Sequence, residues 1–208
     1  FIEADLHFMI LNYRLFFLSI SLLFLFQGAK AQNTGNVAIG EWREHLPFSR
    51  GISVCQNDKF VYCATNNGVV IYKKDDGTTE RLSRSTGLTD INLSCVNYHE
   101  QSSTLVIGYK NGNLDLVRNN EVVNVGDIKR STVVQGGKTI NAIRFINDRA
   151  YLCCNFGIVV YDMTNREVRT TLYPSLLNPD IHDVVFDGVN TIYAATSKGL
   201  FSADINNP

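Results

Sequence analysis

The sequence has little of several features that point to a function class. Its 208 residues include only 4 Pro, 2 Met and 1 Trp, and the formal net charge at pH 7 is −1. A chain so close to neutral has no strong overall field for polyanions, and no basic tract stands out in it. We therefore expect no nucleic acid among its partners.

Motifs of catalysis are absent as well. The sequence contains no GxSxG, HExxH, CxxC or phosphate-loop pattern, and no nucleophile signature accompanies its 4 histidines. The stretch "DDGTTE" at 75–80 lacks the alternating oxygen ligands and the distant Glu of a calcium loop, so it is interpreted as a turn. We expect a protein that is not an enzyme and has no metal site and no cofactor.

The 5 cysteines do not indicate a disulfide scaffold, because an odd count cannot pair completely. Cys153 and Cys154 are neighbours, and on a strand they would point to opposite faces. A turn at Asn57-Asp58 would place Cys55 opposite Phe60 and not opposite Cys63. The cysteines are predicted to be small apolar residues of the core.

The long hydrophobic run lies at the N-terminus. From Met9, "MILNYRLFFLSISLLFLFQGAKAQ" combines one Arg, an apolar block and a small-x-small site, which predicts a secretory signal peptide over 9–31. The apolar block Leu15–Phe26 would span only ~18 Å as a helix, well short of a ~30 Å membrane core. Residues 1–8 are interpreted as sequence upstream of the true start, and an exported protein is expected.

What the chain does have is internal repetition. "YCATNNGVVIY" at 62–72 returns as "YAATSKGLFSA" at 193–203, with further copies at 105–117 and 152–162. A repeat of ~40–50 residues built from strand-like runs is typical of a β-propeller blade. Two kinds of anchor residue mark the equivalent positions of the copies: the glycines Gly68, Gly112, Gly157 and Gly199, and the isoleucines Ile52, Ile91, Ile140 and Ile181.

The repeats predict an all-β fold: a partial β-propeller over 52–208, preceded by a leader segment at 32–51 and the signal helix. Each blade is expected to hold up to four short strands, and Asp76-Gly77 predicts a type I′ hairpin turn. Four blades are few for a ring of this repeat length, so an N-terminal part of a larger ring is expected, with a closed four-bladed ring as the alternative. The blades are placed near 52–90, 91–139, 140–180 and 181–208.

The second strand of each repeat is a continuous apolar run, which indicates cover on both faces by neighbouring blades. Small residues in these runs are expected where the blades converge and little space remains. They are Ala64, Gly108, Cys153 and Ala194.

The candidate binding surface is the face where the turns between second and third strands meet the blade-to-blade crossings. The segment "GEWREHLPFSRG" at 40–51 is interpreted first as a strand or plug packed on the ring, with a ligand contact through Trp42 as the alternative. The candidate contact residues in the turns are Asn66, Asn67, Lys110, Asn111, Asn113, Asn155, Phe156 and Lys198.

Several stretches, taken in order, resemble the N-terminal β-propeller of the PorZ family, cell-surface components of the type IX secretion system of Bacteroidota. They are "GEWREHLPFSRG", "VYCATNNGVVIY", "STGLTDINLSCVNY", "LVIGYKNGNLDLV", "GGKTINAIRF" and "FGIVVYD". The resemblance implies a non-enzymatic protein exported through the periplasm to the outer-membrane surface. It implies as partners a sortase-like protease and a shuttle protein of the attachment complex, and anionic lipopolysaccharide as the ligand.

Two other functions remain open. "GLTDINLSCV" followed by "LVIGYKNGNL" is also similar to the repeats of periplasmic sensor propellers in hybrid two-component regulators. A plain carbohydrate-binding propeller is the third possibility. A sensor would continue to a membrane helix and a kinase, whereas a PorZ-like chain would continue to a second propeller.

Overall fold

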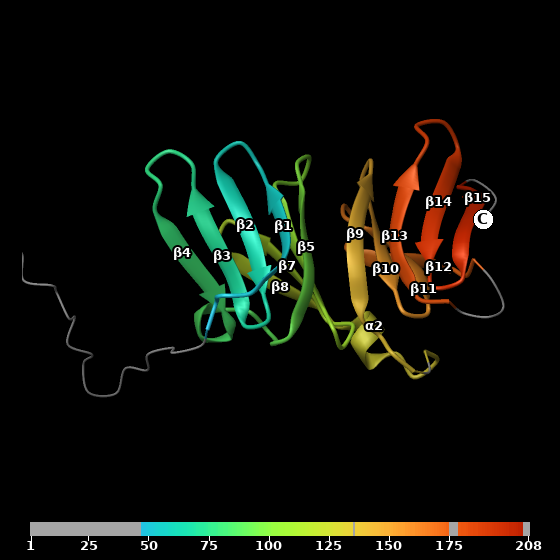
Figure 1. The fold of residues 1–208 in the computed structure, drawn as a ribbon, viewed down its shortest axis with the longest axis horizontal. Coiled ribbons are helices and arrows are strands. Elements are labelled where there is room, and N and C mark those ends of the chain that lie inside the picture. The colour runs from blue at the N-terminus through green and yellow to red at the C-terminus, as the bar shows by residue number, and fades with distance from the viewer. Residues whose placement is uncertain (1–46, 135, 175–178, 206–208) are drawn as a thin grey trace, which may run out of the picture. The chain divides into compact units, whose positions relative to one another are not determined.

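The computed structural model describes residues 47–134, 136–174 and 179–205, and this part of the chain is built from antiparallel strands (Figure 1). The predicted signal peptide, the residues before it and Trp42 lie outside the described residues. The strands are β1 Gly51–Gln56, β2 Phe60–Thr65, β3 Gly68–Lys73, β4 Thr79–Ser83, β5 Leu93–His99, β6 Thr104–Tyr109, β7 Leu114–Arg118, β8 Glu121–Val125, β9 Ile140–Ile146, β10 Arg149–Cys154, β11 Gly157–Asp162, β12 Glu167–Leu172, β13 Ile181–Phe186, β14 Thr191–Thr196 and β15 Gly199–Asp204.

The strands form four sheets, and within each sheet the strands follow chain order. We call the sheets blades 1 to 4: β1–β4, β5–β8, β9–β12 and β13–β15. The first strands β1, β5, β9 and β13 contact one another in succession, so they line the common inner edge (Figure 1). The short helices η1 (Arg84–Thr86) and α2 (Asp127–Arg130) lie in the crossings between blades. The all-β, propeller-type fold predicted from the repeats is confirmed.

The core lies between the blades, in three separate clusters. Along β6, Leu105 and Ile107 pack against blade 1, whereas Val106 packs against blade 3. Because successive side chains of a strand point to opposite faces, a strand between two neighbours must be apolar at every position. All six residues of β6 are buried accordingly.

Blades 1 and 4, at the two ends of this array, each have a neighbouring blade on one face only among the described residues, and they expose apolar side chains on the other face. On blade 1, Val54 is 66% exposed and Tyr72 is exposed; on blade 4, Val185 and Leu200 are 65% and 73% exposed. These side chains face away from the neighbouring blade within the described residues. Strands β2 and β14 are therefore less completely buried than β6 and β10, although the same sequence pattern runs through all four.

Small residues do fill the narrow space between blades. A Cβ on Gly108 would lie 2.7 Å from Cys95 Sγ and 3.0 Å from Ile140 Cγ2 of the next blade. Cys153 and Cys154 belong to different interblade clusters, which confirms that they point to opposite faces. All 5 cysteines are free, and burial raises the pKa of the thiols of Cys55 and Cys95 to about 12.

A β-bulge at the start of each first strand corrects the alignment of the repeats. The register shifts after Gly51, Leu93, Ile140 and Ile181, so these four residues are equivalent. The isoleucine anchor was therefore wrong by one residue at Ile52 and by two at Ile91. Both isoleucines are exposed, at 40% and 41%, so they do not belong to the core as the pattern suggested.

Two hairpin turns also differ from the prediction. The turn at 74–78 is longer than a type I′ turn: Lys73 N–H donates to Thr78 O, and of the central pair only Gly77 has a positive φ, 70°. At the β1–β2 turn, the Asn57 side chain accepts from the N–H groups of Lys59 and Phe60 and widens the loop. As a result Cys55 lies opposite Tyr62 and not opposite Phe60.

Candidate functional site

The turns and crossings that carry the predicted contact residues lie at one end of the blades, which we call the crossing end. It comprises the turns between second and third strands together with the crossings 84–92, 126–139 and 173–180. In blades 2, 3 and 4 a backbone hydrogen bond ties the turn to the residue just before the first strand of the same blade: Lys110 N–H to Asn92 O, Asn155 N–H to Thr139 O, and Ser197 N–H to Asp180 O. In blade 1 the turn is tied to the crossing 84–92 instead, because Asn66 O accepts from Asn92 N–H. The turns and crossings therefore form a continuous framework.

An ionic cluster joins the first two crossings. Asp90 accepts from Asn111 Nδ2 at 2.7 Å and from Lys129 Nζ at 2.6 Å. Burial alone would raise the pKa of the Asp90 carboxyl, but these two hydrogen bonds, the backbone N–H of Ile91 and the charge of Lys129 together outweigh it and hold the pKa below its usual value. Lys138 Nζ donates to the carbonyl oxygens of Lys129 and Ser131 at the end of α2. This cluster fixes the position of α2 beside the turn of blade 2.

Beneath that cluster lies a buried carboxylate network. Asp115 is fully buried and accepts from Thr89 N, Thr89 Oγ1, Tyr109 OH and Asn124 Nδ2, at 2.9, 2.6, 2.6 and 2.9 Å. Asn113 Nδ2 donates to Thr89 Oγ1 as well. These hydrogen bonds join the crossing 84–92 to blade 2, so the buried network holds the backbone of this crossing in position at the crossing end.

The predicted contact residues are distributed unevenly over this end. Lys110, Asn111 and Lys198 are exposed, and Asn66, Asn67 and Asn155 are half-buried. Asn113 and Phe156 are buried, at 2% and 7% exposure, so their side chains do not reach the surface. A binding role for the exposed residues stays a prediction.

The buried position of Asn113 has a local cause. The turn of blade 2 holds the four residues 110–113, whereas the corresponding turns of the other blades hold two. Tyr109 N–H donates to Asn113 O, so Asn113 stands at the place that Gly68 and Gly157 occupy elsewhere. The glycine anchor at Gly112 was therefore misaligned, because the inserted residues are themselves an Asn-Gly pair.

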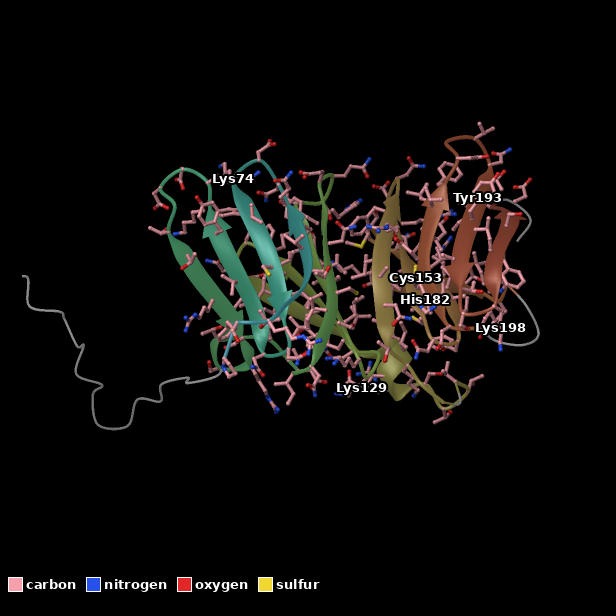
Figure 2. All side chains as sticks on the ribbon, in the orientation of Figure 1. Lys74, Lys129, Cys153, His182, Tyr193 and Lys198 are labelled. Carbon is pink, nitrogen blue, oxygen red and sulfur yellow. The ribbon has the colours of Figure 1, made fainter. Side chains whose placement is uncertain are left out.

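The charges of the described residues are separated between the two ends of the blades. The turns and crossings of the crossing end, with residues 47–50, hold seven basic and three acidic side chains. The turns at the opposite end, which we call the turn end, hold three basic and six acidic ones. Figure 2 shows Lys129 and Lys198 at the crossing end and Lys74 at the turn end. The net charges of about +4 and −3 nearly cancel, so the composition alone concealed them.

The charged side chains at the crossing end are Arg50, Arg84, Lys110, Lys129, Arg130, Lys138 and Lys198, with Asp90, Asp127 and Asp180. Lys129 and Arg130 are paired with Asp90 and Asp127. Among the described residues, no ion pair engages Lys110 or Lys198. Exposed Arg50 and Arg84 likewise take part in no ion pair among the described residues, and Lys110 and Lys198 are the two cations that lie in turns between second and third strands.

Sequence reasoning missed the residues at the bulges. Ser94 Oγ donates to Ile140 O at 2.6 Å, and Asn141 Nδ2 donates to Ile181 O at 2.8 Å, so each bulged side chain reaches the next blade. His182 occupies the same position in blade 4 and is exposed. A polar residue directly after the first apolar residue of the first strand in blades 2, 3 and 4 was the available signal, but the misplaced isoleucine anchor hid it.

Comparison with known families assigns the chain. The family model described as "TSS9, PorZ, N-terminal beta-propeller domain" matches residues 61–207, more than half of the chain. The chain belongs to the PorZ N-terminal β-propeller family. Curated protein sequences gave no match.

Solved structures agree on the fold. PorZ of Porphyromonas gingivalis, an essential surface component of its type-IX secretion system, matches with a TM-score of 0.65 and 24% identity over 76% of this chain. The extracellular domain of the hybrid two component system BT4673 from B. thetaiotaomicron matches with a TM-score of 0.66 and 13% identity over 80% of the chain. The computationally designed protein Ika4 matches with a TM-score of 0.58 and 13% identity, over 79% of this chain and 99% of its own.

The chain spans about a fifth of the length of the P. gingivalis and B. thetaiotaomicron proteins, 21% and 22%. Within the described ranges, no helix has the length and apolar character needed to cross a membrane. The same residues contain no group of three or more His, Cys, Asp or Glu placed to hold a metal ion. The two named natural relatives are, respectively, a surface component and an extracellular domain.

Proposed function

We propose that this PorZ-family propeller is a non-enzymatic, exported component of the type IX secretion machinery, and that it binds anionic lipopolysaccharide through its crossing end. Membership of the PorZ family supports the assignment to type IX secretion. In this proposal the attachment complex, with its sortase-like protease and shuttle protein, works beside the propeller at the outer-membrane surface.

The single observation that supports lipopolysaccharide at the crossing end is the separation of charge between the two ends of the blades. Exposed Lys110 and Lys198, at turns tied to the crossings by backbone hydrogen bonds, stand on a fixed framework. A rigid cationic face attracts polyanions and costs little conformational entropy when it binds them. The near-neutral composition argued mildly against such a surface, and the separation of charge removes that objection.

Binding by purified protein tests the proposal. The doubly substituted Lys110→Glu/Lys198→Glu protein is expected to bind immobilised anionic lipopolysaccharide at least about tenfold more weakly, since charge reversal at two exposed contacts acts through attraction and repulsion together. The matched control is Lys59→Glu/Lys74→Glu, which makes the same charge change at the turn end. Equal loss in both proteins would show that net charge, and not the crossing end, governs binding.

Deletion of the gene tests the place in secretion. Type IX cargo is expected to remain unprocessed and unattached in the deletion strain, and to be restored by the wild-type gene. Normal processing and attachment of cargo in the deletion strain would overturn the assignment to this machinery.

The sensor function is the second candidate, because two B. thetaiotaomicron extracellular domains share the fold, one described as that of a one component system and one as that of a hybrid two component system. Their identities to this chain, 12% and 13%, support the fold alone. The family match to PorZ therefore favours secretion. A carbohydrate-binding propeller without a secretion role is the third candidate, and binding of neutral glycans as tightly as of anionic lipopolysaccharide would favour it.

A further inference from the structure

A second surface feature lies at the turn end, far from the predicted binding residues along each strand. A groove of about 430 Å³ opens between blades 1 and 2, lined by the β1–β2 turn on one side and by the 100–103 and 119–120 turns on the other. Its volume falls within the range of ligand pockets, ~300–1,000 Å³. No residue of the predicted candidate set lines it.

Aromatic rings form the floor of this groove. Tyr62 and Tyr98, from neighbouring blades, stack with ring centroids 5.8 Å apart and planes inclined by 9°, and Phe60 packs against Tyr62 at 6.0 Å. Tyr62 is buried, whereas Phe60 and Tyr98 are partly accessible. The Tyr62 hydroxyl oxygen accepts from Asn57 Nδ2 at 3.3 Å, so its proton can be donated elsewhere.

Carboxylates form much of the charged rim. Asp58, Glu80 and Glu100 line the groove together with one ammonium group, that of Lys59. Glu80 is paired with Lys73 at 2.5 Å, and Lys74 Nζ donates to Asn57 O at 2.6 Å. Among the described residues, no ion pair engages Asp58 or Glu100. The groove also belongs to the end of the blades whose turns are net acidic.

The negative charge of Glu100 acts on Tyr62, one of the aromatic residues that line the groove. Burial raises the pKa of Tyr62 to about 12, and the charge of Glu100 is among the further causes that raise it. A carboxylate that disfavours a second negative charge at Tyr62 favours a positive charge at the same place. An anionic ligand would meet the opposite potential here.

The space between blades 2 and 3 differs from the groove between blades 1 and 2, because side chains fill it. Between blades 2 and 3 at the same end, the His99 ring packs against Phe145 with centroids 4.8 Å apart. His99 is also bonded to Ser102 Oγ at 2.7 Å and to Asn147 O at 3.1 Å, so it is fixed there as part of the packing. The equivalent space between blades 1 and 2 is left open.

We propose that the groove between blades 1 and 2 binds an arginine side chain presented by a protein partner, with the guanidinium held between the Tyr98 ring and the carboxylates of Asp58 and Glu100. Arginine fits better than lysine because its planar guanidinium can lie against a ring and donate to two carboxylates at once. This site is at the opposite end from the lipopolysaccharide surface, so it does not depend on the proposed function.

The test uses the purified protein labelled with 3-fluorotyrosine and followed by fluorine NMR, with the Tyr62 and Tyr98 signals assigned from Tyr→Phe variants. N-acetyl-arginine amide is expected to shift the Tyr98 signal in a saturable manner, whereas the uncharged isostere N-acetyl-citrulline amide is not. Glu100→Gln should weaken binding about fivefold, the scale of one ion pair at an exposed site. Glu100 is exposed, so the variant is expected to fold.

Asp75→Asn is the matched control, because Asp75 lies at the same end, is exposed and lines no part of the groove. It should leave the affinity unchanged. Equal shifts with the citrulline amide, equal weakening by Asp75→Asn, or no shift at saturating arginine amide would each overturn the site. A Gly-Arg-Ser peptide is expected to bind at least as tightly as the amide, and its exclusion would overturn the assignment to a protein partner.

Discussion

Removal of the Asp115 carboxylate is the perturbation from which the structure predicts the largest loss of stability. Asp115 is fully buried and accepts four hydrogen bonds, two from Thr89 and one each from Tyr109 and Asn124. In Asp115→Ala, the Thr89 N–H and the Tyr109 hydroxyl lose the acceptor they have inside the protein, whereas Asn124 Nδ2 can still donate to Asn113 Oδ1 and Leu114 O. Because burying the charge is itself costly, the four bonds do not add, and the expected net loss is about 3–5 kcal/mol.

Equilibrium unfolding in urea measures this loss. The midpoint is expected to fall sharply with little change in the slope, since the folded and unfolded surfaces are nearly the same. Asp75→Ala, which removes an exposed carboxylate, is the control and should change stability by less than about 0.5 kcal/mol. A loss below about 1 kcal/mol for Asp115→Ala would refute the view that this network fastens the crossing 84–92 to blade 2.

Three further perturbations follow from the same structure. Burial, with the hydrogen bond and charge of Asp115, raises the pKa of Tyr109 above its ordinary value. Stability should therefore fall as pH rises beyond about 10, because Tyr109 then ionises only in the unfolded chain. A urea midpoint unchanged between about pH 8 and 10.5 would contradict this. Burial raises the pKa of the Cys55 and Cys95 thiols to about 12. Both thiols should therefore react with a disulfide reagent near pH 8 only after the protein unfolds. Rapid modification of the folded protein would contradict the burial of these two side chains. In Gly68→Ala the new Cβ would lie 2.3 Å from Leu82 O, whereas nothing lies within 4 Å of the new Cβ in the matched variant Gly199→Ala. Gly68→Ala should therefore be less stable than Gly199→Ala by about 1–3 kcal/mol. Equal thermal stability of the two variants would count against this close contact.

The repeats were enough to predict the fold class, because each blade packs against its neighbours through equivalent strands and therefore needs a similar pattern of apolar residues. The runs 105–109 of β6 and 150–154 of β10 contain no charged residue since both faces are covered, and that pattern is visible in the sequence. Details that break the repeat were not predictable in the same way. The four-residue turn of blade 2 is such a detail, and no periodic signal marks it. The bulges recur in all four blades, but the misplaced isoleucine anchor hid them.

The candidate site was predictable as a place but not as a set of contacts. The turns and crossings do meet at one end of the blades, as their order in the chain required. Whether a turn residue is exposed depends on its side-chain partners, however, and Asn113 is buried by a network whose members come from three separate strands and a crossing. The separation of charge was likewise invisible, because opposite charges alternate along the sequence and separate only when strands fold antiparallel.

Site-specific photo-crosslinking in intact cells tests most directly which end of the blades meets lipopolysaccharide. A photoreactive amino acid at Asn67 samples the crossing end, and one at Asp75 samples the turn end. The account predicts lipopolysaccharide adducts from position 67 and none from position 75. Adducts from position 75 alone would contradict it.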